Sequence, residues 1–387
     1  MEFSNRLKSL PTQFFATLVH KVANAVSEGR DVINLGQGNP DQPTPEHIVK
    51  ALQDAATNPQ SHKYSPFRGI NELKQAAADF YAREYQVEIN PNTEVAIMFG
   101  TKIGLVELPL ALMNENELML LPDPGYPDYL SGVGLANVRF DTMPLIEENN
   151  YLPDYSRLTA EQKNAAKLMY LNYPNNPTGA TATKEFFEET VALAKESDIA
   201  IVHDFAYGGI GFDGKKPVSF LQTEGAKDVG VEMYTLSKTY NMAGWRVGFA
   251  VGNPTIIEAI NLIQDHLFVS LFPAVQSAAA AALNANQQCV DELVSLYEGR
   301  RNALVKSCMK IGWDVKAPKG SFFAWLPVPI GYTSEAFADL LLDKANVAVA
   351  AGNGFGTYGE GYVRVGLLVS EDRLIEAIER IEKLHLF

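Results

Sequence analysis

Short apolar runs separated by stretches of helical periodicity constrain the fold of this chain more than any other feature of its sequence. The runs cover residues 94–99, 118–121, 167–173, 199–203, 232–236 and 247–251. Between two of them, in residues 184–197, apolar residues recur at every third or fourth position, as on one face of a helix. Continuous apolar strands that alternate with helices are typical of a mostly parallel sheet with helices on both faces. The sequence therefore predicts an α/β fold.

Polar residues directly follow nearly all of these predicted strands. The polar segments, in chain order, are Gly100-Thr101-Lys102, Asp123-Pro124-Gly125-Tyr126, Asn175-Asn176-Pro177-Thr178-Gly179, Asp204-Phe205-Ala206-Tyr207 and Ser237-Lys238. In open sheets of this kind, ligands bind beyond the carboxyl ends of the strands. We therefore expect these segments, though distant in sequence, to meet at one edge of the sheet and form a binding site.

The segment 235–248 indicates what that site binds. Lys238 lies where a predicted strand ends, with the hydroxyl residues Thr235 and Ser237 just before it. Arg246 follows eight positions later. An amine beside hydroxyls and an arginine suits an imine-forming nucleophile next to a bound phosphate. Pyridoxal 5'-phosphate (PLP) offers both an aldehyde for the lysine and a phosphate to anchor. The alternative is an exposed lysine in a polar turn.

After about residue 275, the alternation of apolar strands and helices gives way to a long helix-prone stretch. The helix-prone segments that follow are 275–285, its continuation to about 309, 334–345 and 370–384. Ser370 suits the N-cap of the last of these helices. We expect a large domain at residues 46–280 that holds the sheet. Residues 1–45 and 281–387 are expected to form a smaller α+β domain.

Composition excludes several classes of protein. The 387 residues are 47% hydrophobic and 20% charged, which is typical of a globular protein, and no apolar run approaches the ~20 residues of a membrane span. The net charge of −14, without a basic stripe, argues against nucleic acid as a partner. No signal peptide is apparent at the N-terminus. Cys289 and Cys308 have neither metal nor redox spacing, so we expect no metal and a cytoplasmic protein.

Several segments together resemble the fold-type I, class I/II aminotransferases in their order and spacing. They are Gly36-Gln37-Gly38-Asn39-Pro40-Asp41, Tyr64 with Gly69, Asn175-Asn176-Pro177-Thr178-Gly179, Asp204 with Tyr207, Ser237-Lys238 with Arg246, and Arg364. The resemblance covers essentially the whole chain. It implies a PLP enzyme that moves an amino group between an L-amino acid and a 2-oxo acid by a ping-pong mechanism. It also implies a homodimer with shared active sites.

The resemblance assigns roles around the reacting atoms of the cofactor. Lys238 would form the imine and then move the proton between the substrate Cα and C4′ as general base. Asp204 would keep the pyridine nitrogen protonated, so that the ring acts as an electron sink. Tyr207 and Asn176 would bond the phenolic oxygen and keep it ionised, and Asn176 would also contact substrate. The alternatives are a helix cap or surface turn for Asp204 and a plain turn for Asn176.

The other cofactor contacts would surround the phosphate and the ring face. The phosphate contacts would be the side chains of Arg246, Thr235 and Ser237 and the backbone amides of Gly100, Thr101 and Lys102, before a helix at 103–113. Lys102 stands where the family often has a small hydroxyl residue, so we expect its backbone to contribute more than its side chain. Tyr126 would stack on the ring, or else pack locally in a turn. Tyr64 resembles the tyrosine that reaches the phosphate of the neighbouring subunit.

Arg364 lies in an otherwise apolar, strand-like run. A buried arginine needs an anionic partner, and the resemblance supplies the α-carboxylate of the substrate, held in a bidentate pair. Gly38 would let the backbone close over the substrate, where a side chain would obstruct it. The alternative for Arg364 is a structural salt bridge.

Within the family, the chain is especially similar to bacterial transaminases of methionine salvage, which transfer an amino group from glutamine to 4-methylthio-2-oxobutanoate. The similarity includes segments 34–41 and 350–356. Candidates for an apolar side-chain pocket are Phe14, Phe15, Tyr64, Phe67, Phe268 and Phe272. Transaminases of alanine, aspartate, aromatic amino acids or diaminopimelate derivatives are alternatives, because the sequence identifies neither the donor nor the acceptor.

Other classes share parts of this pattern. A carbon–sulfur lyase or a cyclopropane-carboxylate synthase of the same fold type keeps every cofactor residue, so only product analysis separates it from a transaminase. A transcription regulator that senses amino acids would need an added DNA-binding domain, for which the 33 residues before Asn34 leave no room. An inactive homologue is disfavoured because four residues are all retained: Lys238, Asp204, Arg246 and Arg364.

Overall fold

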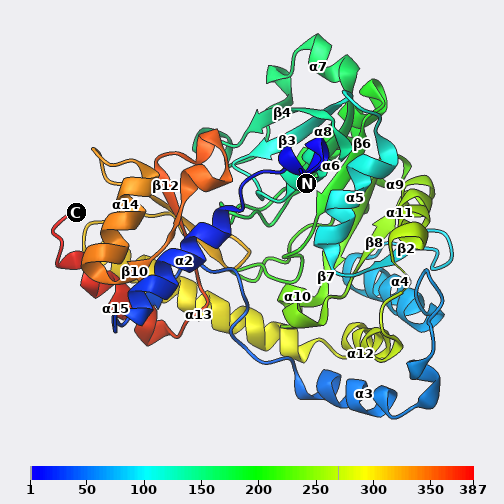
Figure 1. Ribbon diagram of the computed structural model, residues 1–387, viewed down its shortest axis with the longest axis horizontal. Helices are drawn as coiled ribbons and strands as arrows, with labels where there is room; N and C mark the ends of the chain where they lie inside the picture. Colours follow the sequence, from blue (N-terminus) through cyan, green and yellow to red (C-terminus); the bar gives the residue numbers. More distant parts are fainter. Residues whose placement is uncertain (1, 269) are drawn as a thin grey trace.

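A seven-stranded sheet lies at the centre of the structure, a computed structural model that describes residues 2–268 and 270–387 (Figure 1). Its strands, in spatial order, are β2 (Val95–Met98), β8 (Gly248–Gly252), β7 (Gly230–Thr235), β6 (Ala200–Asp204), β5 (Ala166–Asn172), β3 (Leu118–Asp123) and β4 (Arg139–Pro144). β8 runs antiparallel to both of its neighbours, whereas the other pairs are parallel. The predicted mostly parallel sheet is therefore confirmed.

Helices cover both faces of this sheet. One face carries α5 (Thr101–Leu112), α6 (Tyr129–Ala136) and α11 (Pro254–Leu267), and the other carries α3 (Glu46–Ala56), α4 (Asn71–Tyr85), α8 (Lys184–Ser197) and α12 (Pro273–Asn284). Successive side chains of a strand point to opposite faces, and in β6 Ile201 joins one core while Val202 joins the other. Both are fully buried. The continuous apolar pattern of the strands follows from this two-sided burial.

The C-terminal part of the chain, together with residues near the N-terminus, forms a second core. Its strands are β9 (Phe323–Pro327), β11 (Ala350–Ala351) and β12 (Tyr362–Gly366) in an antiparallel sheet, and β1 (Ile33–Asn34) paired in parallel with β10 (Val347–Ala348). Its helices are α2 (Phe14–Ser27), α13 (Gln288–Lys310), α14 (Ser334–Leu340) and α15 (Glu371–Glu382). Figure 1 shows this part, in orange and red with the blue α2, beside the central sheet.

Two details of this second part test the expectations from sequence. Ser370 caps α15 as expected, since its hydroxyl accepts a hydrogen bond from the amide of Arg373. The expectation of a single α-helix at 334–345 is wrong for its second half. The α-helix α14 ends at Leu340, and a π-helical turn, Leu341–Ala345, follows it. The turn ends at Asn346, whose left-handed conformation stops the helix.

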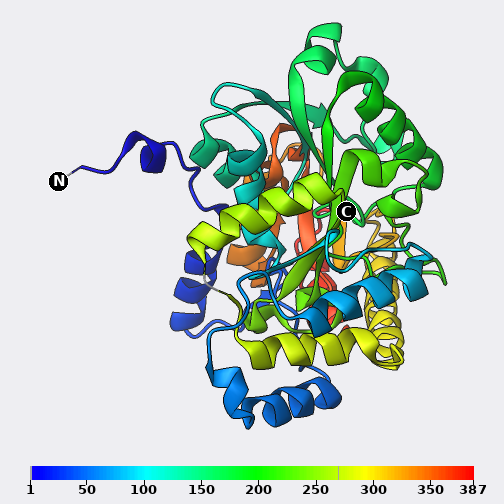
Figure 2. The same cartoon turned by 90° about the vertical axis from the view of Figure 1, so that its right-hand side faces the viewer.

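The remaining elements are short. They are α1 (Asn5–Lys8), η1 (Pro59–His62), η2 (Glu147–Asn149), η3 (Tyr155–Arg157), α7 (Ala160–Ala165), η4 (Phe220–Gln222), α9 (Ala226–Val229), α10 (Leu236–Thr239), η5 (Ala243–Trp245), η7 (Gly352–Phe355) and η8 (Thr357–Gly359). Figure 2 shows the segment around α1 projecting away from the rest of the chain. Among the described residues, no helix has the length and apolar character needed to cross a membrane.

Candidate active site

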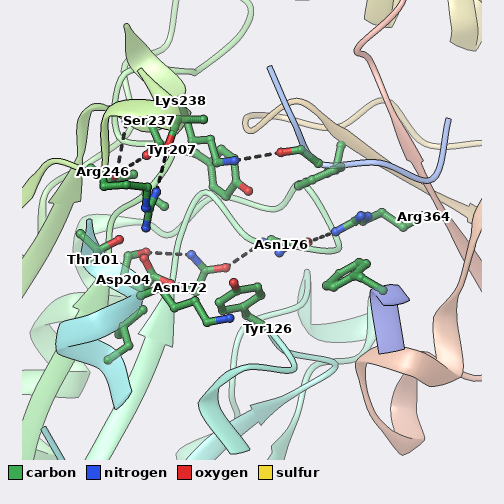
Figure 3. A pocket seen from close by; sticks show the side chains of 18 residues that line it. Thr101, Tyr126, Asn172, Asn176, Asp204, Tyr207, Ser237, Lys238, Arg246 and Arg364 are labelled. Atoms are coloured by element: carbon green, nitrogen blue, oxygen red, sulfur yellow. Dashed lines mark hydrogen bonds between the residues drawn. The ribbon is translucent and has the colours of Figure 1, made fainter. Parts of the chain in front are cut away.

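A cavity of about 340 Å³ opens where the carboxyl ends of the central strands meet the second core (Figure 3). The predicted residues that line it are Gly38, Thr101, Lys102, Tyr126, Asn176, Asp204, Tyr207, Thr235, Ser237, Lys238, Arg246 and Arg364. Gly100 and Tyr64 are not among the residues that line it. The structure thus brings together the segments that follow the strands, as expected for a sheet of this type.

Lys238 is in α10, directly after β7, and its amine points into the cavity. Its Nζ donates a hydrogen bond to the backbone oxygen of Gly38 at 2.8 Å. Burial, with the positive charges of Arg364 and Arg246, lowers the pKa of the Lys238 amine to about 8. A neutral amine, which is the nucleophilic form, is therefore available near neutral pH.

Asp204 is the last residue of β6 and is 5% exposed. Its Oδ2 accepts a hydrogen bond from the hydroxyl of Tyr129 at 2.8 Å, whereas its buried Oδ1 has no partner among the described residues. Burial raises the pKa of Asp204 to about 6, against the opposing effect of the Tyr129 bond. An unpaired buried carboxylate oxygen is costly, so this site is suited to a ligand that donates a proton or a hydrogen bond.

A chain of hydrogen bonds joins Asp204 to Arg364 across the cavity (Figure 3). Asn172 donates to the backbone oxygen of Asp204 at 2.7 Å, and its own Oδ1 accepts from the backbone N–H of Asn176 at 2.7 Å. Asn176 Oδ1 in turn accepts from Arg364 Nη1 at 2.9 Å. The amide of Asn176 is thereby oriented, with its oxygen toward Arg364 and its Nδ2 donor left for another acceptor.

Arg364 is 1% exposed and occupies the middle of β12. Its Nη2 donates to the backbone oxygen of Gly36 at 2.9 Å, and the rings of Phe323 and Phe355 pack against its guanidinium. Burial lowers its pKa to about 10, and the groups that oppose this shift are tyrosines rather than carboxylates. The structural salt bridge considered from sequence is therefore not seen among the described residues. A buried guanidinium of this kind is poised to bind an anion.

A second positive region lies at the start of α5. Arg246, in a left-handed conformation, donates to the backbone oxygens of Ala243 at 3.0 Å and Phe99 at 3.4 Å. A Cβ on Gly100 would lie 2.4 Å from Arg246 Nη2, so only glycine allows this approach. The free N–H groups of the first turn of α5 and the guanidinium together make an anion site.

Hydroxyl groups complete this anion site, whereas the side chain of Lys102 is engaged in an ion pair. Thr235 donates to Ser237 at 3.0 Å, and both residues line the cavity. Lys102 Nζ pairs with Asp128 Oδ2 at 2.8 Å, so its side-chain charge is already matched. This pairing agrees with the expectation that Lys102 contributes mainly through its backbone.

The aromatic residues expected to form an apolar side-chain pocket do not lie together in the structure. Phe15 of α2 lines the cavity, whereas Phe67 and Phe268 line a different, smaller one and Phe272 is 44% exposed. Phe14 packs edge-on against Phe15 and Phe355 outside the lining. Tyr64 is 88% exposed. The proposed apolar pocket is thus reduced to Phe15 within this chain.

Residues of the site that escaped the analysis of the sequence include Tyr129, Asn172 and Phe323, whose ring lines the cavity and packs against Arg364. Tyr129 lies three residues after Tyr126 and is 2% exposed, and it contacts two residues that line the cavity, Asp204 through its hydroxyl and Tyr126 through its ring. Asn172 ends β5 and lines the cavity directly. The position of Asn172 at a strand end, just before the Asn175-Asn176 motif, is a signal that could have identified it.

Comparison with known proteins places this geometry in a family. The sequence profile of the family described as "Aminotransferase class I and II" matches residues 30–381. A Bacillus subtilis protein named L-glutamine--4-(methylsulfanyl)-2-oxobutanoate aminotransferase is 68% identical over 386 residues, covering 100% of this chain and 97% of that protein. An LL-diaminopimelate aminotransferase of Halothermothrix orenii is 43% identical, covering 99% of this chain and 98% of that protein.

Solved structures agree with the sequence relatives. The apo structure of BacF from Bacillus subtilis, whose sequence is named a transaminase, has a TM-score of 0.96 at 48% identity and covers 100% of this chain and 99% of that one. The aspartate aminotransferase of Thermotoga maritima has a TM-score of 0.89 at 29% identity and covers 99% of both chains. With a family match over most of its length, this chain belongs to the class I and II aminotransferases, which are PLP-dependent enzymes.

Proposed function

We propose that this aminotransferase transfers the amino group of L-glutamine to 4-methylthio-2-oxobutanoate. The name and 68% identity of the Bacillus subtilis relative support these substrates. The observation that carries the proposal is the buried Arg364, which has no acidic partner among the described residues and lies in one cavity with Lys238. Phe15 offers an apolar surface in that cavity for a methylthioethyl side chain. A transaminase of diaminopimelate-type substrates is the second candidate, supported by relatives at 43% identity.

The residues present fit PLP as the cofactor. PLP supplies, when bound, an aldehyde for the lysine and a ring that withdraws electrons from the reacting carbon. The unpaired Oδ1 of Asp204 would accept from the pyridine N–H. Arg246, with the hydroxyls of Thr235 and Ser237, would bind the phosphate. The N–H groups of Thr101 and Lys102, at the start of α5, would complete this anion site, and Tyr126 would cover the ring face. The predicted contribution of the Gly100 amide is not available in this structure, because its N–H donates to the backbone oxygen of Met98 at 2.8 Å.

The chain's own side chains would handle the protons of the reaction. Lys238, with its lowered pKa, would take the proton from the substrate Cα and deliver it to the C4′ position. Because Asn176 Oδ1 is held by Arg364, its Nδ2 is the atom that would donate to the phenolic oxygen of the cofactor. The hydroxyl of Tyr207 would donate to the same oxygen. Burial raises the pKa of Tyr207, which keeps this hydroxyl protonated and able to donate.

The carboxylate of the substrate would bind to Arg364, with Asn176 beside it. A Cβ on Gly38 would lie 3.3 Å from Phe323 Cζ and 3.9 Å from Arg364 Nη2, so a side chain there would fill the space for the carboxylate. Two parallel N–H···O bonds from the guanidinium would fix the orientation of the amino acid.

A screen of donors and acceptors tests this proposal. We expect glutamine with 4-methylthio-2-oxobutanoate to give the highest kcat/KM in a panel of amino acids and 2-oxo acids, measured by the cofactor absorbance and by amino acid analysis of the products. Aspartate, alanine and LL-diaminopimelate serve as comparison donors. A preference for diaminopimelate would replace the proposal with the second candidate. Release of pyruvate and a thiol without an acceptor would identify a carbon–sulfur lyase.

We also propose that the enzyme is a homodimer with shared sites. Tyr64 and Phe67 are 88% and 57% exposed, as are Leu262 (53%) and Leu267 (57%), and a partner subunit would cover such apolar side chains. Tyr64 would then reach the phosphate site of the partner. Its exposed position in this chain is consistent with that role.

Subunit mixing tests the shared site. Tyr64→Ala and Lys238→Ala subunits, each inactive or nearly so alone, should regain up to about a quarter of the wild-type activity when they are mixed and allowed to exchange. Random pairing makes half of the dimers mixed, and each mixed dimer has one site without a lesion. Absence of recovery after verified exchange would contradict the shared site.

The organisation and location of the chain are further proposals. We propose that residues 46–280 form the large PLP-binding domain and that residues 1–45 with 281–387 form the small domain. The hydrophobic core of the C-terminal part, which is separate from the cores on the two faces of the central sheet, supports this division. We propose a cytoplasmic location, supported by Cys289 and Cys308, which are both free thiols.

A further inference from the structure

Arg300, on α13, links two segments of the chain. One is the loop between β1 and α3, residues 35–45, and the other is the end of β12, the strand that carries Arg364. The Nη1 and Nη2 atoms of Arg300 donate to Asp41 Oδ1 and Oδ2 at 2.8 and 2.7 Å. Its Nη1 also donates to the backbone oxygen of Leu367, just after β12, at 3.0 Å. Arg300 is 4% exposed. Two parallel bonds to one carboxylate fix its direction as well as its distance, so Arg300 holds the loop in one position.

This loop supplies the backbone acceptors for the two cationic side chains of the cavity. Gly36 accepts from Arg364 Nη2 at 2.9 Å, and Gly38 accepts from Lys238 Nζ at 2.8 Å. Asp41 follows Gly38 by three residues. Within the described part of the chain, its bonds with Arg300 are the hydrogen bonds that attach residues 39–43 to another element. The pair with Arg300 is therefore the attachment nearest to Gly38, and the next one is the bond from the Thr44 hydroxyl to the backbone oxygen of Asn241 at 2.7 Å.

We propose that Arg300 is a positioning residue of this aminotransferase. Through Asp41, it sets where the two backbone oxygens of the loop lie. Those oxygens in turn orient the amine of Lys238 and the guanidinium of Arg364. The effect on substrate use rests on the function proposed above, whereas the effect on the Lys238 amine does not.

The charges of the pair favour this rigid arrangement at neutral pH. Burial opposes ionisation of Asp41, yet the bonds from Arg300 hold the pKa of this carboxyl below its usual value. Asp41 thus stays ionised at neutral pH. A lysine in place of Arg300 would keep the charge, but its single ammonium lacks the planar fork that bonds both carboxylate oxygens.

The neighbouring Arg301 provides a matched control. It is 5% exposed in its side chain and donates to both oxygens of Asp213, at 2.9 and 2.7 Å. The two arginines are thus adjacent on one helix, equally buried and each in a two-point pair with an aspartate, although the side chain of Asp213 is 60% exposed and that of Asp41 22%. Asp213 lies outside the cavity, so Arg301→Lys removes the same kind of interaction without touching the loop.

The experiment compares Arg300→Lys with Arg301→Lys. In the full chain freed of PLP, the rate at which acetic anhydride labels Lys238 is followed against pH by peptide mass spectrometry. Loss of the hydrogen bond to Gly38 disfavours the ammonium, so the midpoint should fall by about one pH unit in Arg300→Lys. In the holoenzyme, KM for the 2-oxo acid should rise about tenfold, with a smaller change in kcat. Arg301→Lys should leave both values unchanged, although it too should lower the melting temperature.

Asp41→Asn provides a second variant in case Arg300→Lys does not fold. It keeps the side-chain volume but weakens the pair, and it should shift the labelling midpoint in the same direction. If Arg300→Lys and Asp41→Asn behave like Arg301→Lys in labelling and in KM, Arg300 has only a structural role and the inference is wrong. A labelling shift in a protein that fails to transfer amino groups would reject the proposed function and leave this inference intact.

Discussion

Lys238→Ala should lower kcat/KM for amino transfer by more than about 10⁴-fold. General acid–base catalysis alone contributes about 10²- to 10⁴-fold, and this substitution removes both the proton carrier and the nucleophile. The amine lies 2.8 Å from the backbone oxygen of Gly38, and its pKa is lowered to about 8 by burial and by Arg364 and Arg246. No other described lysine that lines the cavity is free of an ion pair, since Lys102 is paired with Asp128. Single-turnover mixing, followed by the cofactor absorbance, measures the loss.

Lys238→Arg is the matched variant for this prediction. It keeps a positive charge in the cavity but has no amine that can attack an aldehyde. It should be as inactive as Lys238→Ala, and both variants should still bind PLP through the contacts at Arg246 and Asp204. Turnover by Lys238→Ala within tenfold of the wild-type rate would contradict the assigned role.

Asp204→Asn should slow proton removal from the substrate Cα by about 10²- to 10⁴-fold. Breaking a buried ion pair costs about 3–5 kcal/mol, and each 1.4 kcal/mol corresponds to a factor of ten in rate. Asp204 is 5% exposed, and its Oδ1 has no partner among the described residues, so this oxygen is free for the pyridine nitrogen. Asparagine has the same shape and can still bond to Tyr129, but it cannot hold a proton on that nitrogen. Rapid mixing with amino acid, in the absence of acceptor, isolates this step.

Asp123→Asn separates loss of catalysis from loss of a buried carboxylate. Asp123 is also 5% exposed and ends β3, which is separated from β6 by β5 alone, but it accepts from the backbone amides of Thr357 and Tyr358 and does not line the cavity. This variant should lose thermal stability while slowing the half-reaction far less than Asp204→Asn. Equal slowing in the two variants would show that Asp204 acts through the fold and not through the cofactor.

The central sheet and most of the cavity lining could be predicted from the sequence, for a definite physical reason. Strands buried on both faces must be apolar throughout, so β5 and β6 read as continuous apolar runs. The residues that end them are at the edge of the sheet where ligands bind, and there polar side chains such as Asp204 interrupt the apolar pattern. The position of a residue at a strand end was therefore enough to identify much of the site.

Other features depended on tertiary contacts that no local pattern reveals. β4, with the sequence Arg139-Phe140-Asp141-Thr142-Met143-Pro144, was not predicted because it is an edge strand whose residues are largely exposed. Tyr129 reads as an ordinary helical aromatic, and only the fold brings its hydroxyl to Asp204. The pair of Arg300 with Asp41 joins residues 259 positions apart, which spacing along the chain cannot indicate.

Borohydride reduction of the purified enzyme, followed by peptide mapping, tests the central claim most directly. Reduction converts the lysine–cofactor linkage into a stable bond, so the modified residue can be identified by mass spectrometry. The account predicts a single pyridoxyl label on Lys238, and no label after reduction of Lys238→Ala. A label on another lysine, such as Lys102, or the absence of any label in a yellow protein, would contradict the assignment of Lys238 and the site built around it.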